Sequence, residues 1–336
     1  MATHKERIEF IDLAKGICIV LVVLDHICGE QSGPFILSMN MFRMPLYFVL
    51  SGLFFKPYNF RTFIRKKTNK LLIPFSCSFL FIIIPLEFLL NCFLYGDITH
   101  FHLWEQRGRL NLGQTPAAWF LLCLFIVNIY FYCLFIFCRN RIIMISITGT
   151  ICGIIGYTLN YYDLYLPMWI DSSLTVLPFF IVGYITRKYS NILYDSFSRN
   201  HAILLLLSLS ILSLTYYINK STSPDSTILF VYNIYNINVF SLYVGGIAGT
   251  FAVLMTAKYF THLPIISFIG RYSIIVLLTH QLYIFVLCNI LYQLNIPQNS
   301  LGVTFGIFVI VILLSLPTIK LCIKYLPYWF AQKDLW

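Results

Sequence analysis

Ionisable side chains interrupt the first apolar stretch of the sequence, IEFIDLAKGICIVLVVLDHICGE, which runs from Ile8 to Glu30. Lys15 and His26 are eleven residues apart, and a helix turning about 100° per residue brings both onto one face, about 16 Å apart along its axis. The helix then presents a cation at one end of a possible cavity and, farther along, an imidazole that can accept a proton near neutral pH. A hydrogen-bonded structural histidine is the alternative interpretation of His26.

A second stretch, FRMPLYFVLSGLFF from Phe42 to Phe55, combines Arg43 and Ser51 with a proline and a glycine in an aromatic helix. In membrane helices these two helix-breaking residues often lie beside a cavity, where neighbouring groups satisfy the freed backbone. A simple kink with small-residue packing is the alternative.

Four cations follow in the stretch FIRKKTNKLLIPF: Arg65, Lys66, Lys67 and Lys70. Such a cluster suits the phosphates of a nucleotide-like donor or of lipid head groups. It is also typical of a loop whose charge only sets membrane topology.

Four further ionisable residues are candidates for supporting roles. Asp25 neighbours His26 in sequence, so its side chain should point about 100° away and shape the outer mouth of a site. Glu87 and Arg43 are candidate partners inside the bundle. His280 belongs to a later apolar helix, where a structural and a catalytic role both remain open.

Metal ligands and disulfides have weak signals in this sequence. His100 and His102 form an H-x-H pair with Glu105 nearby, but no convincing further ligand set follows, so we predict no metal. The ten cysteines are scattered through apolar runs without a C-x-x-C pair and are expected to be packing residues.

The composition determines what must position these groups. Of the 336 residues, 59% are hydrophobic and only 11% are charged, unlike an ordinary soluble domain. Apolar runs long enough to cross a hydrocarbon core of about 30 Å recur throughout. We therefore predict an all-α, polytopic integral membrane bundle of about ten transmembrane helices. The expected spans are roughly 9–28, 35–55, 71–94, 116–138, 141–159, 172–187, 202–219, 236–257, 265–291 and 301–325.

The basic clusters indicate the orientation of these spans. With ten crossings the Lys and Arg clusters, from Lys5 and Arg7 to Lys333, all fall on one side, which the positive-inside rule makes cytoplasmic. Both termini are then cytoplasmic, and the net charge of +10 reflects topology in a lipid bilayer rather than a nucleic-acid partner. Three tryptophans near the outer interface are expected in an aromatic belt: Trp104, Trp119 and Trp169. We expect one transmembrane domain over residues 1–336, without an appended soluble domain.

Several motifs together resemble a known family. They are K-x10-H from Lys15 to His26, the stretch Phe42–Gly52, the basic run into LLIPF, AWFL at 118–121, LPFFIVGY at 177–184 and IGRYSIIVLLTH at 269–280. In this order they resemble the membrane acyltransferase-3 family, and RIEFIDLAKG looks most like its fucose 4-O-acetylase-like branch. The ordered set is fairly specific for the family and much less so for a substrate.

The resemblance implies an integral-membrane O-acyltransferase that places acetyl from acetyl-CoA, a co-substrate rather than a bound cofactor, on a sugar hydroxyl. The acceptor would be a cell-envelope or exported polysaccharide or its lipid-linked precursor. The family's essential histidine corresponds to His26, and its donor-linked cation to Lys15. Its R-x-x-R motif corresponds to Lys67 and Lys70, which keep the charge but lose bidentate phosphate geometry. The implied location is a cell membrane, in the multi-pass form expected for a bacterial inner membrane.

Three alternatives remain open on sequence grounds. His26 can act as a general base on the hydroxyl or as a covalent acyl-imidazole relay. The donor can be another acyl-CoA, such as succinyl-CoA. Finally, intramembrane Asp, Glu and His also occur in proton-coupled transporters, although no repeat or paired set of broken helices is apparent here.

Overall fold

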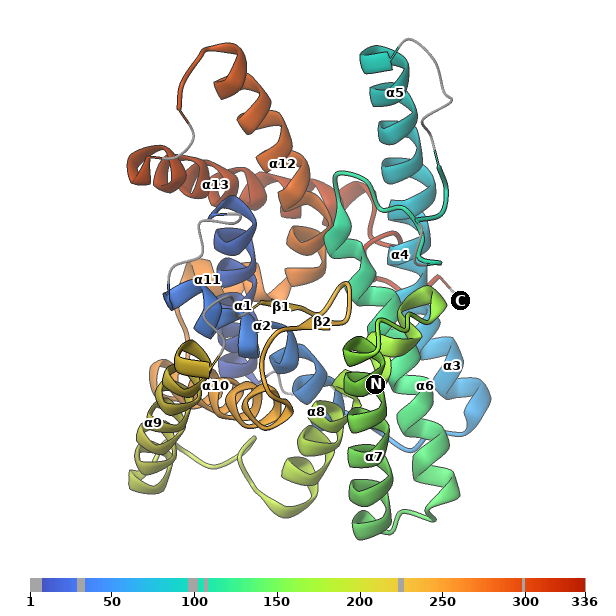
Figure 1. Ribbon diagram of the computed structural model, residues 1–336, viewed down its shortest axis with the longest axis vertical. Helices are drawn as coiled ribbons and strands as arrows, with labels where there is room; N and C mark the ends of the chain where they lie inside the picture. Colours follow the sequence, from blue (N-terminus) through green and yellow to red (C-terminus); the bar gives the residue numbers. More distant parts are fainter. Residues whose placement is uncertain are drawn as a thin grey trace.

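The computed structural model describes residues 8–28, 34–95, 102–105, 108–222, 227–297 and 300–335. Predictions made for Lys5, Arg7, Glu30 and His100 lie outside these residues. Most of the chain is helical, with one small antiparallel hairpin (Figure 1). The elements are α1 (Glu9–Cys28), α2 (Pro34–Leu53), α3 (Phe60–Lys67), α4 (Ile73–Ser78), α5 (Ile84–Tyr95), α6 (Trp119–Phe137), α7 (Ile142–Tyr161), α8 (Ile170–Tyr189), α9 (Arg199–Thr222), β1 (Ile228–Leu229), β2 (Ile234–Tyr235), α10 (Val239–Phe260), α11 (Pro264–Arg271), α12 (Ser273–Gln293) and α13 (Leu301–Tyr325).

Helices of membrane length dominate the fold. Among the described residues, eight are long and apolar enough to cross a bilayer. α1 and α2 add two helices of 20 residues each, which span about 30 Å at 1.5 Å per residue. α1 differs from the eight because Asp12, Lys15 and Asp25 interrupt its apolar sequence. The prediction of an all-α, multi-pass membrane bundle is confirmed.

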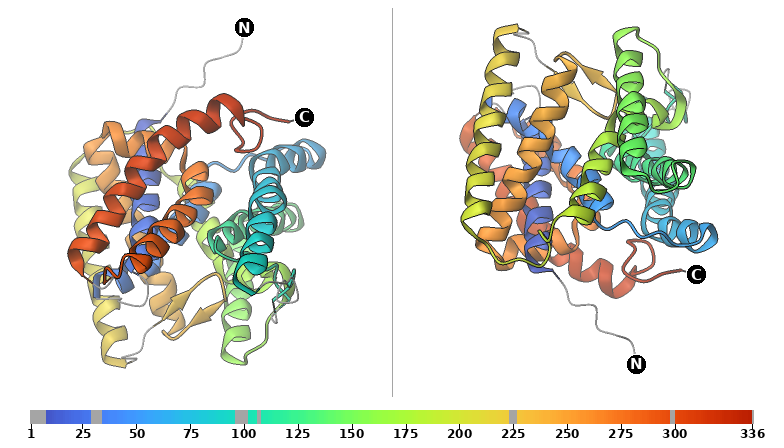
Figure 2. Two further views of the ribbon diagram at one scale, coloured as in Figure 1. Left: turned by 90° about the horizontal axis from the view of Figure 1, so that it is seen from above. Right: turned by 90° about the horizontal axis from the view of Figure 1, so that it is seen from below.

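The peripheral helices expose apolar side chains, as expected for lipid contact. Leu206 of α9 is 65% exposed and Leu313 of α13 is 58% exposed. α12 and α13 pack together along one side of the bundle, and α9 packs on α10 along another (Figure 2). Their outward faces carry too few polar groups for water, so they suit the hydrocarbon region.

The charged helix α1 lies in the centre, next to α2 (Figure 1). α1 packs against α2, α10, α11, α12 and α13, whereas α2 packs against α8, α9 and α10. Asp25 of α1 and Arg43 of α2 are therefore largely enclosed by other helices, where intramembrane charges are tolerated best.

Glycines allow these central helices to approach closely. A Cβ at Gly52 of α2 would overlap the Phe180 carbonyl of α8, and one at Gly183 of α8 would overlap the Val49 carbonyl of α2. Similarly, a Cβ at Gly270 of α11 would overlap the Asp12 carbonyl of α1. Small residues at such crossings let backbones touch, which is a common source of helix association in membranes.

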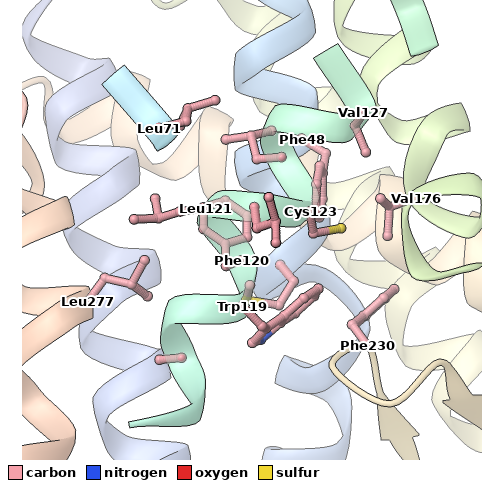
Figure 3. Packing of buried hydrophobic residues seen from close by; sticks show 14 of the residues in the cluster. Phe48, Leu71, Trp119, Phe120, Leu121, Cys123, Val127, Val176, Phe230 and Leu277 are labelled. Atoms are coloured by element: carbon pink, nitrogen blue, oxygen red, sulfur yellow. The ribbon is translucent and has the colours of Figure 1, made fainter. Parts of the chain in front are cut away.

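A hydrophobic cluster fills the space around α6. Phe120, Cys123 and Val127 of α6 pack among Phe48 of α2 and Val176 of α8 (Figure 3). The cluster fixes the N-terminal half of α6 against the central helices.

The helix predicted at 71–94 begins earlier, at Phe60. Asn59 caps its start by accepting a hydrogen bond from the Thr62 backbone N–H at 3.0 Å, so the basic run is helical rather than a loop. α3, α4 and α5 continue one another through π-helical turns at Thr68–Leu72 and Phe79–Ile83. Each wide turn precedes a proline, whose ring would clash with the carbonyl four residues back in a regular helix.

The helix predicted at 265–291 is broken. α11 ends at Arg271, Tyr272 has φ −115° and ψ 29°, and α12 starts at Ser273. No proline marks the break. Gly270 brings α11 into backbone contact with α1, and α12, which starts after the break, packs against α1 as well.

A small cap covers the ends of α7 and α8. The β1–β2 hairpin is tied down by Asn233, whose side chain donates to the Gly156 carbonyl at 2.9 Å and accepts from Thr175 Oγ1 at 2.8 Å. Trp169 donates to the Val231 carbonyl at 2.9 Å and is 1% exposed.

The aromatic-belt prediction is wrong for Trp119 and Trp169, because both side chains are buried. It is consistent only with Trp104, which is exposed. Trp119 and Trp169 instead form core contacts that composition does not reveal.

Candidate active site

His26 of α1 and His280 of α12 meet inside the bundle. Their ring centroids are 5.2 Å apart and the rings are inclined by 42°. His280 is fully buried, while His26 is partly buried. The structure thus brings together the two histidines that the sequence singled out near opposite ends of the chain.

Gln281 holds the His26 ring through a short chain of hydrogen bonds. Its Oε1 accepts from the Ala117 backbone N–H at 2.8 Å, which fixes the orientation of the amide. Its Nε2 therefore faces Nδ1 of His26, at 3.4 Å. Because an amide nitrogen only donates, a neutral His26 in this arrangement accepts at Nδ1 and carries its proton on Nε2.

His280 has the opposite tautomer. Its Nδ1 lies 2.8 Å from the Val276 carbonyl, which can only accept, so the proton of neutral His280 is on Nδ1. Its Nε2 is buried and has no hydrogen-bond partner among the described residues. A buried unpaired acceptor is costly in a protein interior and is often found where chemistry or binding uses it.

Asp25 and Arg43, both predicted as supporting residues, form an ion pair between α1 and α2. Their side chains are only 15% and 11% exposed, respectively. Cys18 Sγ also donates to the Arg43 carbonyl, at 2.7 Å. The pair links the helix turn that carries His26 to the middle of α2.

Lys15 lies near the junction of α11 and α12. Tyr47 of α2 donates its hydroxyl proton to the Lys15 carbonyl at 3.2 Å, and its hydroxyl lies near the Ser273 side chain. Gly270 touches α1 between Asp12 and Gly16. The part of α1 that carries Lys15, the residue predicted to bind the donor, therefore lies beside the start of α12.

The basic run lies on the first turns of the long helix Phe60–Tyr95. Arg65, Lys66 and Lys70 are exposed, and Lys67 is partly buried. Lys66 Nζ lies 3.7 Å from the centre of the Tyr58 ring, a cation–π contact. Among the described residues, no hydrogen bond or ion pair joins these four cations directly to His26, so a role in donor binding would be at the donor's entry.

Glu87 and Ser51 occupy separate positions. Glu87 accepts from the Gln114 backbone N–H at 2.9 Å and so holds the segment that leads to Ala117 and the amide of Gln281. Ser51 pairs with Asn128 of α6, whose Nδ2 donates to Ser51 Oγ at 3.3 Å. Glu87 thus supports the His26 contact indirectly, whereas Ser51 links α2 to α6.

Sequence reasoning missed two polar contacts. Gln281 was not assigned a role, because a glutamine in an apolar helix has no diagnostic spacing and its partner is a backbone N–H. Arg109 and Asp171 form a fully buried ion pair of 2.7 Å that ties the segment before α6 to the start of α8. Only the charge of Arg109 and Asp171 near predicted span ends could have drawn attention to them.

In the described residues no group of three or more His, Cys, Asp or Glu side chains is arranged to hold a metal ion. A family model described as an acyltransferase domain matches residues 8–320, which include both histidines and Lys15. No curated protein and no solved structure matches the chain.

Proposed function

The chain belongs to the membrane acyltransferase-3 family, and from this premise we propose that it transfers acetyl from acetyl-CoA to a sugar hydroxyl. The acceptor is a cell-envelope or exported polysaccharide, or its lipid-linked precursor, in a bacterial inner membrane. The observation that carries the proposal is the pairing of His26 with His280 in the bundle interior. An imidazole of this pair provides the proton acceptor that an acyl transfer to a hydroxyl requires.

The chemistry assigned to His26 is general base catalysis. A sugar hydroxyl is a weak nucleophile at neutral pH, and loss of its proton to an imidazole as it attacks makes it effective. The oxygen bonds to the thioester carbonyl carbon, the C–S bond breaks, and the CoA thiolate leaves with the proton that the imidazole received. The products are the acetyl ester and CoA thiol, so no further reactant is needed.

The hydrogen bonds of His26 suggest which nitrogen acts. In the arrangement fixed by Gln281, the lone pair of His26 is on Nδ1. The 3.4 Å contact with the amide is long, and a substrate hydroxyl can replace it at little cost. The neighbouring His280 offers a second lone pair, on Nε2, which supports a role for both imidazoles.

Lys15 is assigned to the donor. A cation on the α1 face that also carries His26 suits the phosphates of acetyl-CoA. Its position near the start of α12 supports a donor that enters at this end and extends toward His26.

Two alternatives remain distinct from this proposal. A longer acyl group, such as succinyl, would keep the same proton transfer and change only the space around the thioester. A proton-coupled transporter would use the histidines as a relay but has no reason to bind CoA.

The test uses purified full-length protein in detergent, with acetyl-CoA binding and thiol release as readouts. Wild type should bind acetyl-CoA and release CoA; His26→Ala should bind it without turnover, and Lys15→Ala should bind it weakly. Normal turnover by a stably folded His26→Ala variant would refute the role of His26. If the wild-type protein neither binds nor turns over any acyl-CoA tested, the proposed function is refuted and the transporter is favoured.

A further inference from the structure

A pocket at the α11–α12 junction is not explained by the histidine pair. It has a volume of about 340 Å³ and lies between this junction, the end of α13 and the segment that follows. Its lining residues are Arg271, Tyr272, Ile323, Pro327, Gln332 and Lys333. This volume is within the range of about 300–1,000 Å³ that is usual for small-molecule sites.

The segment after α13 is folded to form one wall of this pocket. The backbone N–H groups of Gln332 and Lys333 both donate to the Pro327 carbonyl, at 2.8 and 3.1 Å. Phe330 is 3% exposed and anchors the turn in the core. Gln332 and Lys333 are thus held at the pocket by a compact turn.

The charge of the pocket suits an anion. Arg271 and Lys333 contribute two cations, and the lining contains no carboxylate. The nearest acidic residue in sequence, Asp334, is exposed and is not part of the lining. α12 begins beside the pocket at Ser273, directly after α11 ends at Arg271, so the opposed dipole ends of the two helices largely offset and the two side chains supply the positive charge.

The same end of the bundle gathers the other predicted donor residues. The Leu335 backbone N–H donates to Asn69 Oδ1 at 3.0 Å, which attaches the segment after Lys333 to the helix turn between Lys67 and Lys70. On the other side, the Tyr47 hydroxyl donates to the Lys15 carbonyl and lies near the Ser273 side chain. Cation-bearing segments from distant parts of the sequence are therefore attached to the start of α12 and to the segment after α13.

The helix α12 runs from the pocket toward the histidine pair. Ser273 is at the pocket, and His280 and Gln281 follow seven and eight residues later, which is about 10–12 Å along a helix. The extended pantetheine arm of a coenzyme A thioester, with two amide units and flanking methylenes, spans a separation of this size.

We propose that this pocket binds the phosphate-bearing nucleotide end of the acyl donor, with Arg271 and Lys333 as phosphate ligands and the thioester extended toward His26. The inference rests on the proposed function and adds two donor residues and a route along α12. An anionic lipid head group shares the phosphate chemistry, and the experiment separates the two sources.

The experiment compares two donors, acetyl-CoA and acetyl-pantetheine, which lacks all the phosphates, with full-length protein in a nonionic detergent. Arg271→Gln and Lys333→Gln should each raise the KM for acetyl-CoA about five- to tenfold, as expected for loss of one charged contact, and leave kcat nearly unchanged. Neither variant should alter the KM for acetyl-pantetheine. Retained transfer from acetyl-pantetheine also shows that the variants are folded.

Lys324→Gln is the matched control. Lys324 is exposed on α13, lies outside the lining, and has its Nζ 4.8 Å from the centre of the Tyr325 ring. Its removal should leave both KM values unchanged, although the net charge falls equally.

The outcomes distinguish this inference from the proposed function. If wild type transfers acetyl from acetyl-CoA but the pocket variants behave like Lys324→Gln, the pocket is not the donor site. If the pocket variants lose binding of an anionic phospholipid added to the detergent micelles while both KM values stay unchanged, the pocket binds lipid phosphate and the inference is refuted. If wild type uses neither donor, the proposed function itself fails.

Discussion

The imidazole of His280 lies beside that of His26, with 5.2 Å between the ring centroids, and its buried Nε2 has no hydrogen-bond partner in the part of the chain that the structure describes. Its Nδ1 is engaged by the Val276 carbonyl. The buried Nε2 lone pair of His280 therefore lowers the stability of the fold unless a substrate or a neighbouring group donates a hydrogen bond or a proton to it. The relationship therefore predicts opposite effects on stability and activity when His280 is replaced.

His280→Leu should lower kcat about 100-fold or more, the usual effect of losing an acid–base group. The melting temperature should stay the same or rise, because an apolar side chain of similar size removes an unpaired buried acceptor. Acetyl transfer and thermal melting of the same preparation measure both effects. A variant with wild-type kcat would make His280 a packing residue, and one that fails to fold would give its ring a structural role.

Gln281 can be tested by two substitutions that separate packing from tautomer control. Gln281→Leu leaves the Ala117 N–H without its acceptor and should cost about 1–3 kcal/mol of stability as well as activity. Gln281→Glu keeps an acceptor for Ala117 but presents a carboxylate oxygen to His26 Nδ1. It should therefore fold but lose kcat, because the proton of His26 moves to Nδ1.

The measurement is kcat and KM for acetyl-CoA together with thermal melting of each Gln281 variant. A change in KM alone would point to donor binding instead. Wild-type kcat in a folded Gln281→Glu protein would show that the tautomer of His26 does not matter.

The sequence indicated candidate site residues but not the residues that they contact. Lys15 and His26 could be placed on one face because helical spacing is a local property. The ion pair of Asp25 with Arg43 and the contact of His26 with Gln281 depend on how α1 crosses α2 and α12, which no spacing encodes. Both members of the Asp25–Arg43 pair were named, but only the packing of the helices joined them.

The fold shows the same division. Apolar length predicted the spans, yet the basic run at 61–70 was interpreted as a loop because charge masks helix periodicity. The Asn59 cap and the π-helical turns before the two prolines explain why the helix starts at Phe60. The break at Tyr272 follows the backbone contact of Gly270 with α1, a tertiary contact that the sequence, with no proline at this point, does not indicate.

The Asp25–Arg43 pair should be strongly coupled. Asp25→Asn or Arg43→Met alone leaves one charge without its partner between packed helices, which should destabilise the protein by about 3 kcal/mol. The double variant Asp25→Asn/Arg43→Met removes both charges and should be more stable than Arg43→Met alone. Thermal melting or denaturant unfolding of all four proteins completes the double-mutant cycle. Additive losses would mean that the pair contributes no interaction energy.

Close helix packing predicts a sharp difference between two glycines. At Gly183 a Cβ would overlap the Val49 carbonyl of α2, so Gly183→Ala must push α8 away from α2 and should destabilise the protein by about 1–3 kcal/mol or more. At Gly306 of α13 a Cβ would meet no atom within 4 Å among the described residues, so Gly306→Ala is a matched control that should be neutral or slightly stabilising. Melting temperatures of the two variants, with yields from membranes, measure the difference.

Gly183→Ala should also lower acetyl transfer. The substitution displaces α2, which carries Arg43, and so disturbs the ion pair between Arg43 and Asp25. Equal melting temperatures for the two variants would show that α2 and α8 are not in backbone contact.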